Sequence, residues 1–445
     1  MKRPFSLLFT LCVLTVSAAM AQTSGNCGTN LTWRLNNGSL VISGSGAMED
    51  YDYASKAPWF SLASQISKVY ISEGVTYVGK KAFGSNVYSL TMVEFGLDVE
   101  RIHQEAFGGI AKLDEVVWGT NAYEDINSYD EGPFWNCDNV IKTFTVLEEV
   151  TYLPNYLCYG LYNMTTLTLG NFVARIGEGC FGNCSRLTSV TLPDDLWRLW
   201  SLTFYGCRSL RSVDLRNVME INGYAFEDCE KLDNITFPAS IKMISAYAFE
   251  GCTSLHNIVW EVDDYVTPAV ATSGPFDQIA RQITSFKFSD NVTKIPPYLC
   301  EKMTCFSDLT LPSGVTEIGR YAFSKCSTIR SLTLPSSLQM IETGGFSSCT
   351  SLRKITSLAC TPPVLQSGVF EDCLPHLSDI TLDVPDGCES AYRTAEGWKE
   401  FSLANEQSIE EVPSDQVPCT KLLRDGQLII IRNGVEYNAA GQIVK

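Results

Sequence analysis

Histidine is scarce in this chain, and so are the residue patterns that catalysis or metal binding requires. Its 445 residues include only three histidines, which lie at unrelated positions: His103, His256 and His376. Cys180 and Cys184 have no partner pair of Cys or His at the spacing that a metal site needs. We therefore expect no catalytic residue, no metal site and no cofactor, and we predict that the protein is not an enzyme.

Positive charge and long apolar runs are scarce as well. The chain has 33 Lys and Arg against 50 Asp and Glu, a formal charge of −17. An acidic surface repels phosphate groups, so neither nucleic acid nor an anionic lipid surface is an expected partner. The longest apolar run extends only from Phe5 to Val16, whereas a membrane-spanning helix needs about 20 residues. No membrane span is expected.

That apolar run is part of a pattern typical of a secretory signal. Lys2 and Arg3 precede it, and the small-residue pattern Ala19-Met20-Ala21 follows it. We therefore predict that residues 1–21 are a removable signal peptide and that the mature protein is extracellular or on the cell surface. Without Lys2 and Arg3, 31 basic and 50 acidic residues would give a formal charge of −19.

What the chain does contain is one pattern many times over, in which Phe is followed three residues later by Cys. Adjacent copies lie roughly 22 to 24 residues apart, a period typical of repeat architectures. Such regular spacing indicates stacked supersecondary units, because each unit buries its apolar edge only against the next. The copies are Phe181/Cys184, Phe204/Cys207, Phe226/Cys229, Phe249/Cys252, Phe323/Cys326, Phe346/Cys349 and Phe370/Cys373.

Apolar residues recur at matching positions within each unit. The Val190-x-Leu192 pair alternates as a short strand does, and Pro193 ends that strand. The Ala-Phe-x-x-Cys stretch is interpreted as a tight helical turn. Each unit is expected to comprise a strand, a corner, a second extended run and a turn, with these side chains and their equivalents pointing inward: Leu187, Val190, Leu192, Leu199 and Phe204.

The Phe position can be followed through 13 units, each of about 22 to 27 residues, at positions 83, 107, 134, 158, 181, 204, 226, 249, 276, 300, 323, 346 and 370. Cys replaces Phe at 158 and 300, and two steps are enlarged, 107 to 134 and 249 to 276. These features share the offset that separates Trp118 from Trp260, about 142 positions along the chain. The sequence therefore predicts one continuous solenoid over residues 71–378 that contains a duplicated six-unit block.

Atypical segments flank the repeats, as solenoid ends require. Residues 22–70, with Trp33 and the Ser-Gly-Ser-Gly-Ala-Met48 segment, are predicted to form an N-terminal β cap. Residues 379–404, with Pro385 and Trp398, are predicted to form a C-terminal cap of a strand and a short helix.

Together these motifs resemble the BspA-type leucine-rich repeat family of bacterial surface proteins, over residues 25 to 403. The resemblance implies a leucine-rich-repeat solenoid, mainly β with short helical turns, and a role as an adhesin or surface-exposed binding protein.

The end of the chain has a different pattern. Residues 405–419 are polar and are predicted to form a linker. In residues 420–445, Asp425-Gly426 and Asn433-Gly434 are two-residue hairpin turns between β-rich runs, so a small module of three or four strands is expected. The module resembles the C-terminal sorting domain that type IX secretion recognises in Bacteroidetes. An additional β cap on the solenoid is the alternative.

Cysteine is abundant, with 17 residues, and eight of them occupy one slot of the repeat. We favour a buried ladder of free thiols, with disulfides between stacked copies as the alternative. The slot holds Cys137, Cys184, Cys207, Cys229, Cys252, Cys326, Cys349 and Cys373. Spacing does not fix any pairing among the others outside the signal, which are Cys27, Cys158, Cys180, Cys300, Cys305, Cys360, Cys388 and Cys419.

Two regions are candidates for binding. The first is the exposed face of the strands, where Thr recurs between the inward-pointing pair; β-propensity alone is the alternative explanation. Its members include Thr168, Thr191, Thr236, Thr310, Thr333 and Thr381. The second is the enlarged unit, where Tyr123, Tyr129 and Trp135 lie beside carboxylates such as Asp125, a combination that suits a sugar or a divalent cation; a loop covering a wider coil is the alternative.

These features favour a secreted or cell-surface, non-catalytic binding protein whose partner outside the cell is a protein or a polysaccharide. The alternative is a structural scaffold of the cell envelope without a specific ligand. The identity of the ligand and the oligomeric state do not follow from the sequence.

Overall fold

The computed structural model describes residues 23–84, 87–134, 137, 139–267, 272–404, 419–424, 427–432, 435–438 and 442–444. The predicted signal peptide, residues 405–418 of the predicted linker and the candidate residue Trp135 lie outside the described residues.

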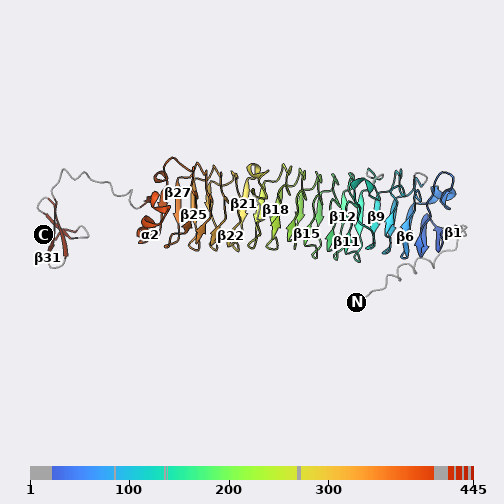
Figure 1. The fold of residues 1–445 in the computed structure, drawn as a ribbon, viewed down its shortest axis with the longest axis horizontal. Helices are drawn as coiled ribbons and strands as arrows, with labels where there is room; N and C mark the ends of the chain where they lie inside the picture. Colours follow the sequence, from blue (N-terminus) through green and yellow to red (C-terminus); the bar gives the residue numbers. More distant parts are fainter. Residues whose placement is uncertain are drawn as a thin grey trace.

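The predicted solenoid is confirmed. Successive coils stack side by side in one elongated array, which runs from β1 at the right of Figure 1 to α2 at the left. The stack comprises about 14 turns, whereas the Phe positions predict 13. The difference arises at the N-terminal cap, because its last hairpin strand already pairs in parallel with the first repeat strand and so adds a turn.

One side of each coil is a short strand, and these strands pair in parallel within interrupted sheets. We name this side the strand face. It is formed by β5 (Lys68–Ile71), β7 (Met92–Phe95), β9 (Glu115–Trp118), β10 (Thr143–Val146), β12 (Thr166–Thr168), β14 (Ser189–Thr191), β16 (Ser212–Asp214), β18 (Asn234–Phe237), β20 (Asn257–Trp260), β21 (Ser285–Phe288), β23 (Asp308–Thr310), β25 (Ser331–Leu334), β27 (Lys354–Ser357), β29 (Thr381–Asp383) and β30 (Ser402–Leu403). The sheets are interrupted between β12 and β14, β16 and β18, and β21 and β23.

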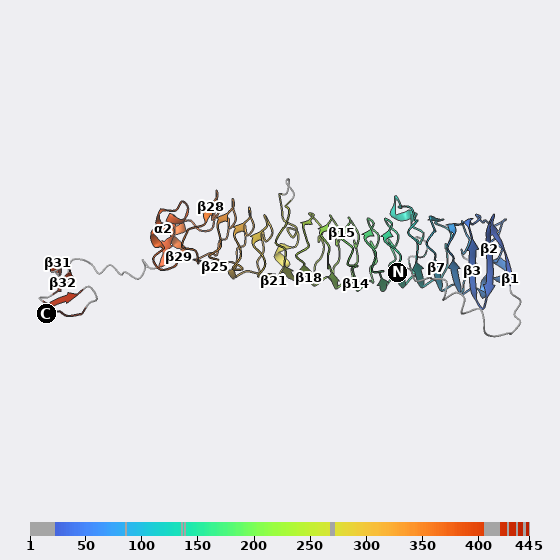
Figure 2. The same ribbon diagram turned by 90° about the horizontal axis from the view of Figure 1, so that it is seen from below.

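The second extended run of most coils forms another set of parallel strands, mostly two residues long, which we name the back face. Figure 2 shows β14, β18 and β21 along one side of the stack and β15 and β28 along the other. The back face comprises β6 (Val75–Val78), β8 (Arg101–Ile102), β11 (Tyr152–Leu153), β13 (Arg175–Ile176), β15 (Arg198–Leu199), β17 (Glu220–Ile221), β19 (Met243–Ile244), β22 (Lys294–Ile295), β24 (Glu317–Ile318), β26 (Met340–Ile341) and β28 (Val364–Leu365).

The Ala-Phe-x-x-Cys stretches are tight hydrogen-bonded turns, as predicted; for example, Cys207 N donates to Phe204 O at 3.1 Å. Other backbone donors of these turns bind the neighbouring coil. Phe204 N donates to Ala225 O of the next coil at 2.8 Å, and Phe226 N donates to Ala248 O at 2.8 Å. These N–H groups bind the neighbouring coil instead of a preceding turn of helix, so the turns form a third line of contacts between coils.

The Phe side chains of the repeat point into the core, as predicted, and form stacked runs that end where Cys158 and Cys300 replace Phe. Phe226 lies 5.6 Å from Phe204 and 5.4 Å from Phe249 between ring centroids, with nearly parallel planes. All seven Phe residues of the Phe-x-x-Cys pattern are buried. Burial of one such ring contributes roughly 1.5–3 kcal/mol to folding, so each run of stacked rings stabilises the coils that it joins.

The cysteine slot is a ladder of thiols, and the disulfide alternative is wrong for it: Cys184, Cys207, Cys229, Cys252, Cys326, Cys349 and Cys373 are free. Each of these thiols donates to a backbone carbonyl of the preceding coil, for example Cys229 Sγ to Phe204 O at 3.3 Å and Cys252 Sγ to Phe226 O at 3.1 Å. Sequence patterns suggested only a small apolar residue. The thiol adds a second, weak donor to a carbonyl that already accepts a backbone N–H, as Phe204 O does from Cys207 N at 3.1 Å.

The N-terminal cap is an antiparallel hairpin of β1 (Thr23–Gly28), β2 (Leu31–Asn36) and β3 (Ser39–Gly44), followed by β4 (Gly46–Ala47) and η1 (Phe60–Gln65). Trp59 covers the end of the Phe stack, with its ring 5.5 Å from that of Phe83. Its Nε1 donates to Ala82 O at 3.0 Å. The cap thus closes the first coil with an aromatic ring whose polar atom is satisfied.

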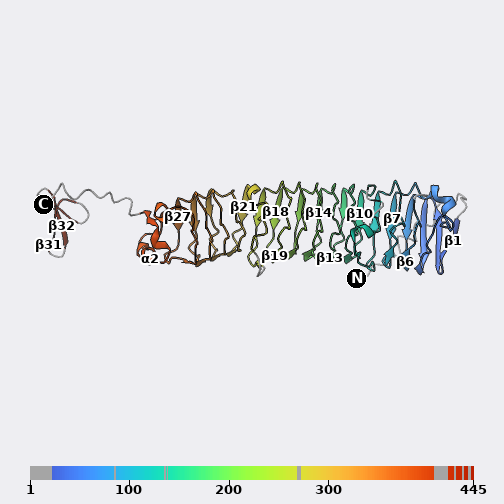
Figure 3. The same cartoon turned by 45° about the horizontal axis from the view of Figure 1, so that its top comes forward.

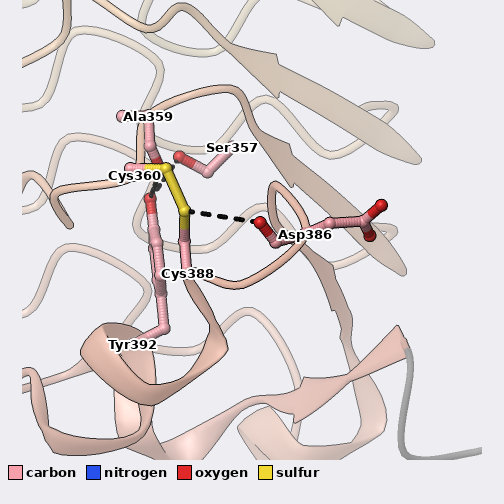
Figure 4. The surroundings of a disulfide bond; sticks show 6 residues. All are labelled: Ser357, Ala359, Cys360, Asp386, Cys388 and Tyr392. Carbon is pink, nitrogen blue, oxygen red and sulfur yellow. Dashed lines mark hydrogen bonds between the residues drawn. A yellow bond between two sulfur atoms is a disulfide. The ribbon is translucent and has the colours of Figure 1, made fainter.

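The C-terminal cap contains α2 (Glu389–Thr394) and η6 (Trp398–Glu400). A disulfide joins Cys360 of the last coils to Cys388 at the start of α2 (Figure 4). Beside it, the Tyr392 hydroxyl lies 2.7 Å from Ser357 Oγ and donates to Ala359 O at 2.8 Å. The helix is therefore attached to the solenoid by a covalent bond and by buried polar contacts.

The end of the chain forms a separate antiparallel sheet of β31 (Cys419–Arg424), β32 (Gln427–Arg432) and β33 (Val435–Asn438). Three strands agree with the hairpin pattern. The predicted turn residues 425, 426, 433 and 434 lie outside the described residues.

Candidate functional site

The strand face presents the predicted threonines outward. Thr168, Thr191, Thr236 and Thr310 are exposed, and Thr333 is half-buried. Parallel pairing places Thr310, Thr333 and Thr356 in one register. Adjacent side chains in this row are separated by the strand spacing of ~4.8 Å.

The row is less regular than the repeat pattern predicts. Asp383, not Thr381, is the residue that pairs with Thr356, so the placement of Thr381 in this row is wrong by two residues. Val259 and Lys287 occupy the row between Thr236 and the later threonines. The face is therefore a mixed surface with two threonine-rich stretches.

A hollow of about 650 Å³ opens on the strand face around two of the predicted residues, Thr310 and Thr333. Leu358 stands at its rim with 51% of its surface exposed. Phe288 and Phe306 contribute aromatic surface to the hollow. The hollow thus combines hydroxyl groups with apolar contact area, which is typical of binding sites.

The hollow lies where strand pairing is interrupted. β21 ends one sheet and β23 begins the next.

The duplication allows this region to be compared with its copy. We name residues 95–220 the first block and residues 237–362 the second block; they are related by the offset that separates Trp118 from Trp260. In the first block the equivalent strands β10 and β12 do pair, with Thr145 opposite Thr168. Val146 and Met164 of that block are replaced by the bulkier Phe288 and Phe306 in the second.

Asp308 supplies charge at the edge of the hollow. The hydroxyl of Ser331 and that of Ser307 donate to its carboxylate, and these hydrogen bonds lower the pKa of Asp308. The carboxylate is therefore ionised at neutral pH and is available as an acceptor for a ligand.

The enlarged unit of the first block differs from the prediction. Tyr123 is buried, with its ring 5.2 Å from that of Trp118, and so it is not a surface anchor. The extra residues of this unit widen the coil, and Tyr123 fills the added space. Tyr129, in η2 (Tyr129–Glu131), has 50% of its surface exposed and lies 5.2 Å from the Tyr159 ring.

A tyrosine cluster that the sequence reading missed continues from Tyr129 along the turn edge. Tyr156 lies 5.9 Å from Tyr159, and both rings lie flat against glycines of the next coil. A Cβ at Gly179 or Gly182 would approach these rings to 2.5 Å, so only glycine permits this packing. Burial and the hydrogen bond to Glu178 raise the pKa of Tyr156 to about 12. Its hydroxyl is therefore a neutral donor.

The carboxylate of Asp125 in this enlarged unit is already engaged. It accepts hydrogen bonds from the Tyr152 hydroxyl and from Asn155 N, and it pairs with Arg175 at 3.4 Å. Within the part of the chain that the structure describes, no group of three His, Cys, Asp or Glu side chains is arranged to hold a metal ion. In the same residues no helix has the length and apolar character to span a membrane.

The model of the BspA type leucine-rich repeat region matches residues 56–163, 151–264 and 273–394, in six copies. The chain belongs to the BspA-type leucine-rich repeat family. The match covers both blocks and the coils before them, and it describes a repeat scaffold that is typically non-enzymatic. No curated protein matches the chain.

Solved structures of other leucine-rich repeat proteins are similar in fold. A protein from Bacteroides ovatus has 18% identity and a TM-score of 0.50, with 84% of this chain and 98% of that chain covered. One from Eubacterium ventriosum has 20% identity and a TM-score of 0.31, covering 79% and 95%. A leucine-rich cell surface protein from Faecalibacterium prausnitzii has 16% identity and a TM-score of 0.28, covering 87% and 99%. At 18% identity, the likeness to the Bacteroides ovatus protein shows the fold alone.

Proposed function

We propose that this BspA-type protein is a secreted or cell-surface, non-catalytic binding protein, an adhesin whose solenoid docks a protein or a polysaccharide outside the cell. The hollow around Thr310 and Thr333 carries this proposal, because it joins apolar floor, hydroxyl groups and an ionised carboxylate on a rigid face. A preformed surface of this kind loses little conformational entropy when a partner binds.

The proposal is tested by a panel binding assay and a matched pair of variants. Purified laminin, collagen, mucin and neutral and acidic polysaccharides are immobilised, and binding of the parent protein is measured by biolayer interferometry. For at least one probe that binds, Thr310→Arg places a long charged side chain in the hollow and should weaken binding at least about tenfold.

Thr168→Arg is the control, because Thr168 occupies the equivalent position in the first block, where the strands are paired. It should leave the affinity within about threefold of the parent. If Thr310→Arg and the parent bind every probe with equal affinity, the hollow is excluded as the binding site. Binding to no member of the panel would favour the alternative of an envelope scaffold.

Export is the second part of the proposal. The amino-terminal pattern at residues 1–21 supports cleavage near Ala21. The tail beginning at Lys421 forms a small sheet of its own, which is compatible with a sorting domain. Deletion of residues 421–445 should then leave folded protein in the periplasm, as measured by cell fractionation. Unchanged delivery to the surface would favour the tail as a cap.

A further inference from the structure

The back face of the first block carries a second distinctive surface, in which aromatic rings alternate with arginines. β11, β13 and β15 stack in register and present Tyr152, Arg175 and Arg198 outward on successive coils. Trp197 and Trp200 flank Arg198 on either side of β15. We name these five residues the back-face patch. Figure 3 shows β13 and β19 on the edge of the stack away from β10 and β14, so the patch is separate from the strand-face hollow.

The arginines of the patch are held by the rings. The Arg198 guanidinium lies 4.3 Å from the centroid of the Trp197 ring and 4.7 Å from that of Trp200. The Arg175 guanidinium lies 4.7 Å from the Tyr152 ring and 5.8 Å from that of Trp200. Such cation–π contacts orient both guanidinium groups. Trp197 nevertheless has 44% of its surface exposed.

The patch is also electrically balanced. Arg175 pairs with Asp125, and Arg198 pairs with Glu220 on the next coil. Each arginine therefore has a carboxylate beside it, and the four charged groups sum to zero. The surface offers many hydrogen-bond donors and acceptors but no net charge to attract an ion.

The second block shows that the fold does not require these residues. Positions equivalent to Tyr152, Arg175, Trp197, Arg198 and Trp200 are Lys294, Glu317, Gln339, Met340 and Glu342. The back-face strands there pair in the same way, with Lys294 opposite Glu317 and Glu317 opposite Met340. Stacking of coils therefore does not require an aromatic residue at these positions, which favours a role in recognition.

We infer that the back-face patch binds a neutral polysaccharide that runs along the axis of the solenoid. The exposed indole of Trp197 and the half-buried rings of Tyr152 and Trp200 can stack on the C–H faces of sugars, and paired guanidinium and carboxylate groups hydrogen-bond to neighbouring hydroxyls. The coil spacing of ~4.8 Å is close to the length of one pyranose in an extended chain, so successive sugars can meet equivalent groups on successive coils. The balanced charges of the patch and the acidic chain as a whole disfavour an anionic polymer.

The tyrosine cluster extends this surface. Asn155 N donates to Asp125, and Asn155 Oδ1 accepts from Glu178 N, whose side chain accepts from Tyr156. These hydrogen bonds lead from Asp125, the partner of Arg175, to Tyr156, and ring contacts through Tyr159 lead on to the exposed ring of Tyr129. A polysaccharide bound to the patch would find further aromatic contact at the turn edge.

The experiment is affinity electrophoresis of the full chain through gels containing β-glucan, xylan, mannan or starch, with alginate and heparin as anionic probes. We expect at least one neutral polysaccharide to retard the parent protein, with little change between low and high salt. Trp197→Ala and Trp200→Ala should each weaken this binding at least about tenfold, and binding should change the intrinsic tryptophan fluorescence.

The second block supplies the control. Gln339→Ala and Glu342→Ala alter the equivalent positions and should leave retardation unchanged, and Trp200→Phe, which retains a ring, should retain part of the binding. Circular dichroism verifies that each variant is folded. The inference is overturned if no neutral polysaccharide is bound, if only the anionic probes or a protein of the panel bind, or if folded Trp197→Ala and Trp200→Ala variants bind like the parent. Thr310→Arg should not affect this binding, so the strand-face proposal is tested separately.

Discussion

The two blocks of the solenoid have nearly the same core and different surfaces. In the first block the rings of Trp118 and Phe144 lie 6.2 Å apart with their planes at 32°. In the second block Trp260 and Phe286 lie 6.3 Å apart at 31°. The contacts of the core are thus repeated almost pair by pair from the first block to the second.

The polar contacts that shape the enlarged unit are repeated as well. Asn121 Oδ1 accepts from the backbone and hydroxyl of Thr151, and Asp263 Oδ1 accepts from the same groups of Thr293. Only the chemical identity of the acceptor differs.

The surfaces have diverged in opposite ways. The first block has paired strands β10 and β12 and an aromatic back face, whereas the second has the strand-face hollow and a back face without aromatic residues at those positions. The comparison teaches that stacking constrains inward positions strongly and outward positions weakly. Differences between duplicated copies therefore identify candidate binding surfaces better than the repeat pattern itself does.

Alkaline pH should produce the largest effect, and in both blocks. Burial raises the pKa of Cys207 and of Cys252 from 9.0 to about 12. Below pH 9 both the folded and unfolded chains hold these protons, so stability is constant. Between pH 9 and 12 only the unfolded chain releases them, and stability should fall by about 1.4 kcal/mol per pH unit for each thiol.

Urea unfolding at pH 7 and pH 10 measures this loss. The double variant Cys207→Ser, Cys252→Ser has two fewer titrating groups and should lose less stability between the two pH values. An equal loss in the parent and the double variant would show that other groups cause it.

Removing the central tryptophan of either block should have nearly the same large effect. Trp118→Ala and Trp260→Ala each delete a fully buried ring, and each should cost about 3–5 kcal/mol. Hydrogen exchange is the appropriate measurement, because a solenoid need not unfold in a single step. Costs that differ by more than about 1.5 kcal/mol would contradict the equivalence of the two cores.

The ends of the two blocks differ, and the disulfide tests that difference. The first block is followed by further coils, whereas the second is closed by the cap that Cys360–Cys388 attaches. The double variant Cys360→Ser, Cys388→Ser opens a loop with a sequence separation of 28 residues and should cost about 3 kcal/mol. Amides of β27 should then exchange faster, and those of β14 should be unaffected. Faster exchange in both strands would mean that the solenoid unfolds as one unit.

The core could be predicted from the sequence because every inward position is repeated. Phe226 and Cys229 are buried in the structure for the same reason that they recur, since each coil must present the same surface to the next. The direction of Tyr123 could not be predicted in this way. It depends on the width of one enlarged coil, and nothing in the repeat reports that width.

The candidate surfaces were predicted only in part. Thr310 and Thr333 were identified from their place in the strand, but the hollow beside them depends on Phe288 and on an interruption of pairing that no spacing reveals. Trp197 and Trp200 were missed because they lie at positions that vary among the repeats. A position-by-position comparison of the two blocks would have identified them, because the equivalent positions in the second block are Gln339 and Glu342.

The thiol ladder should contribute a moderate, equal amount in each block. Cys184 Sγ donates to Cys158 O at 3.3 Å, and Cys326 Sγ donates to Cys300 O at 3.1 Å. Replacement of Cys184 or of Cys326 by Ala removes the weaker of two donors, because Leu161 N and Met303 N still donate to these carbonyls, and should cost about 1 kcal/mol. Thermal unfolding measures the cost, and Cys→Ser at each site, which keeps a donor, separates the hydrogen bond from the loss of volume. Alanine variants as stable as the parent would show that the thiols only fill space.

The smallest effect concerns the outward pairs on the back face, where the blocks differ most. Lys294 and Glu317 form an exposed ion pair at 3.2 Å, and Glu317→Gln should change stability by less than about 0.5 kcal/mol, less still in high salt. The equivalent change in the first block, Arg175→Gln, removes a charge that is stacked on Tyr152 as well as paired. It should therefore cost about 1 kcal/mol, with a weaker dependence on salt. Chemical denaturation of the two variants at low and high salt measures the loss of stability in each. If Arg175→Gln and Glu317→Gln cost the same at both salt concentrations, the aromatic stacking of Arg175 contributes nothing to folding.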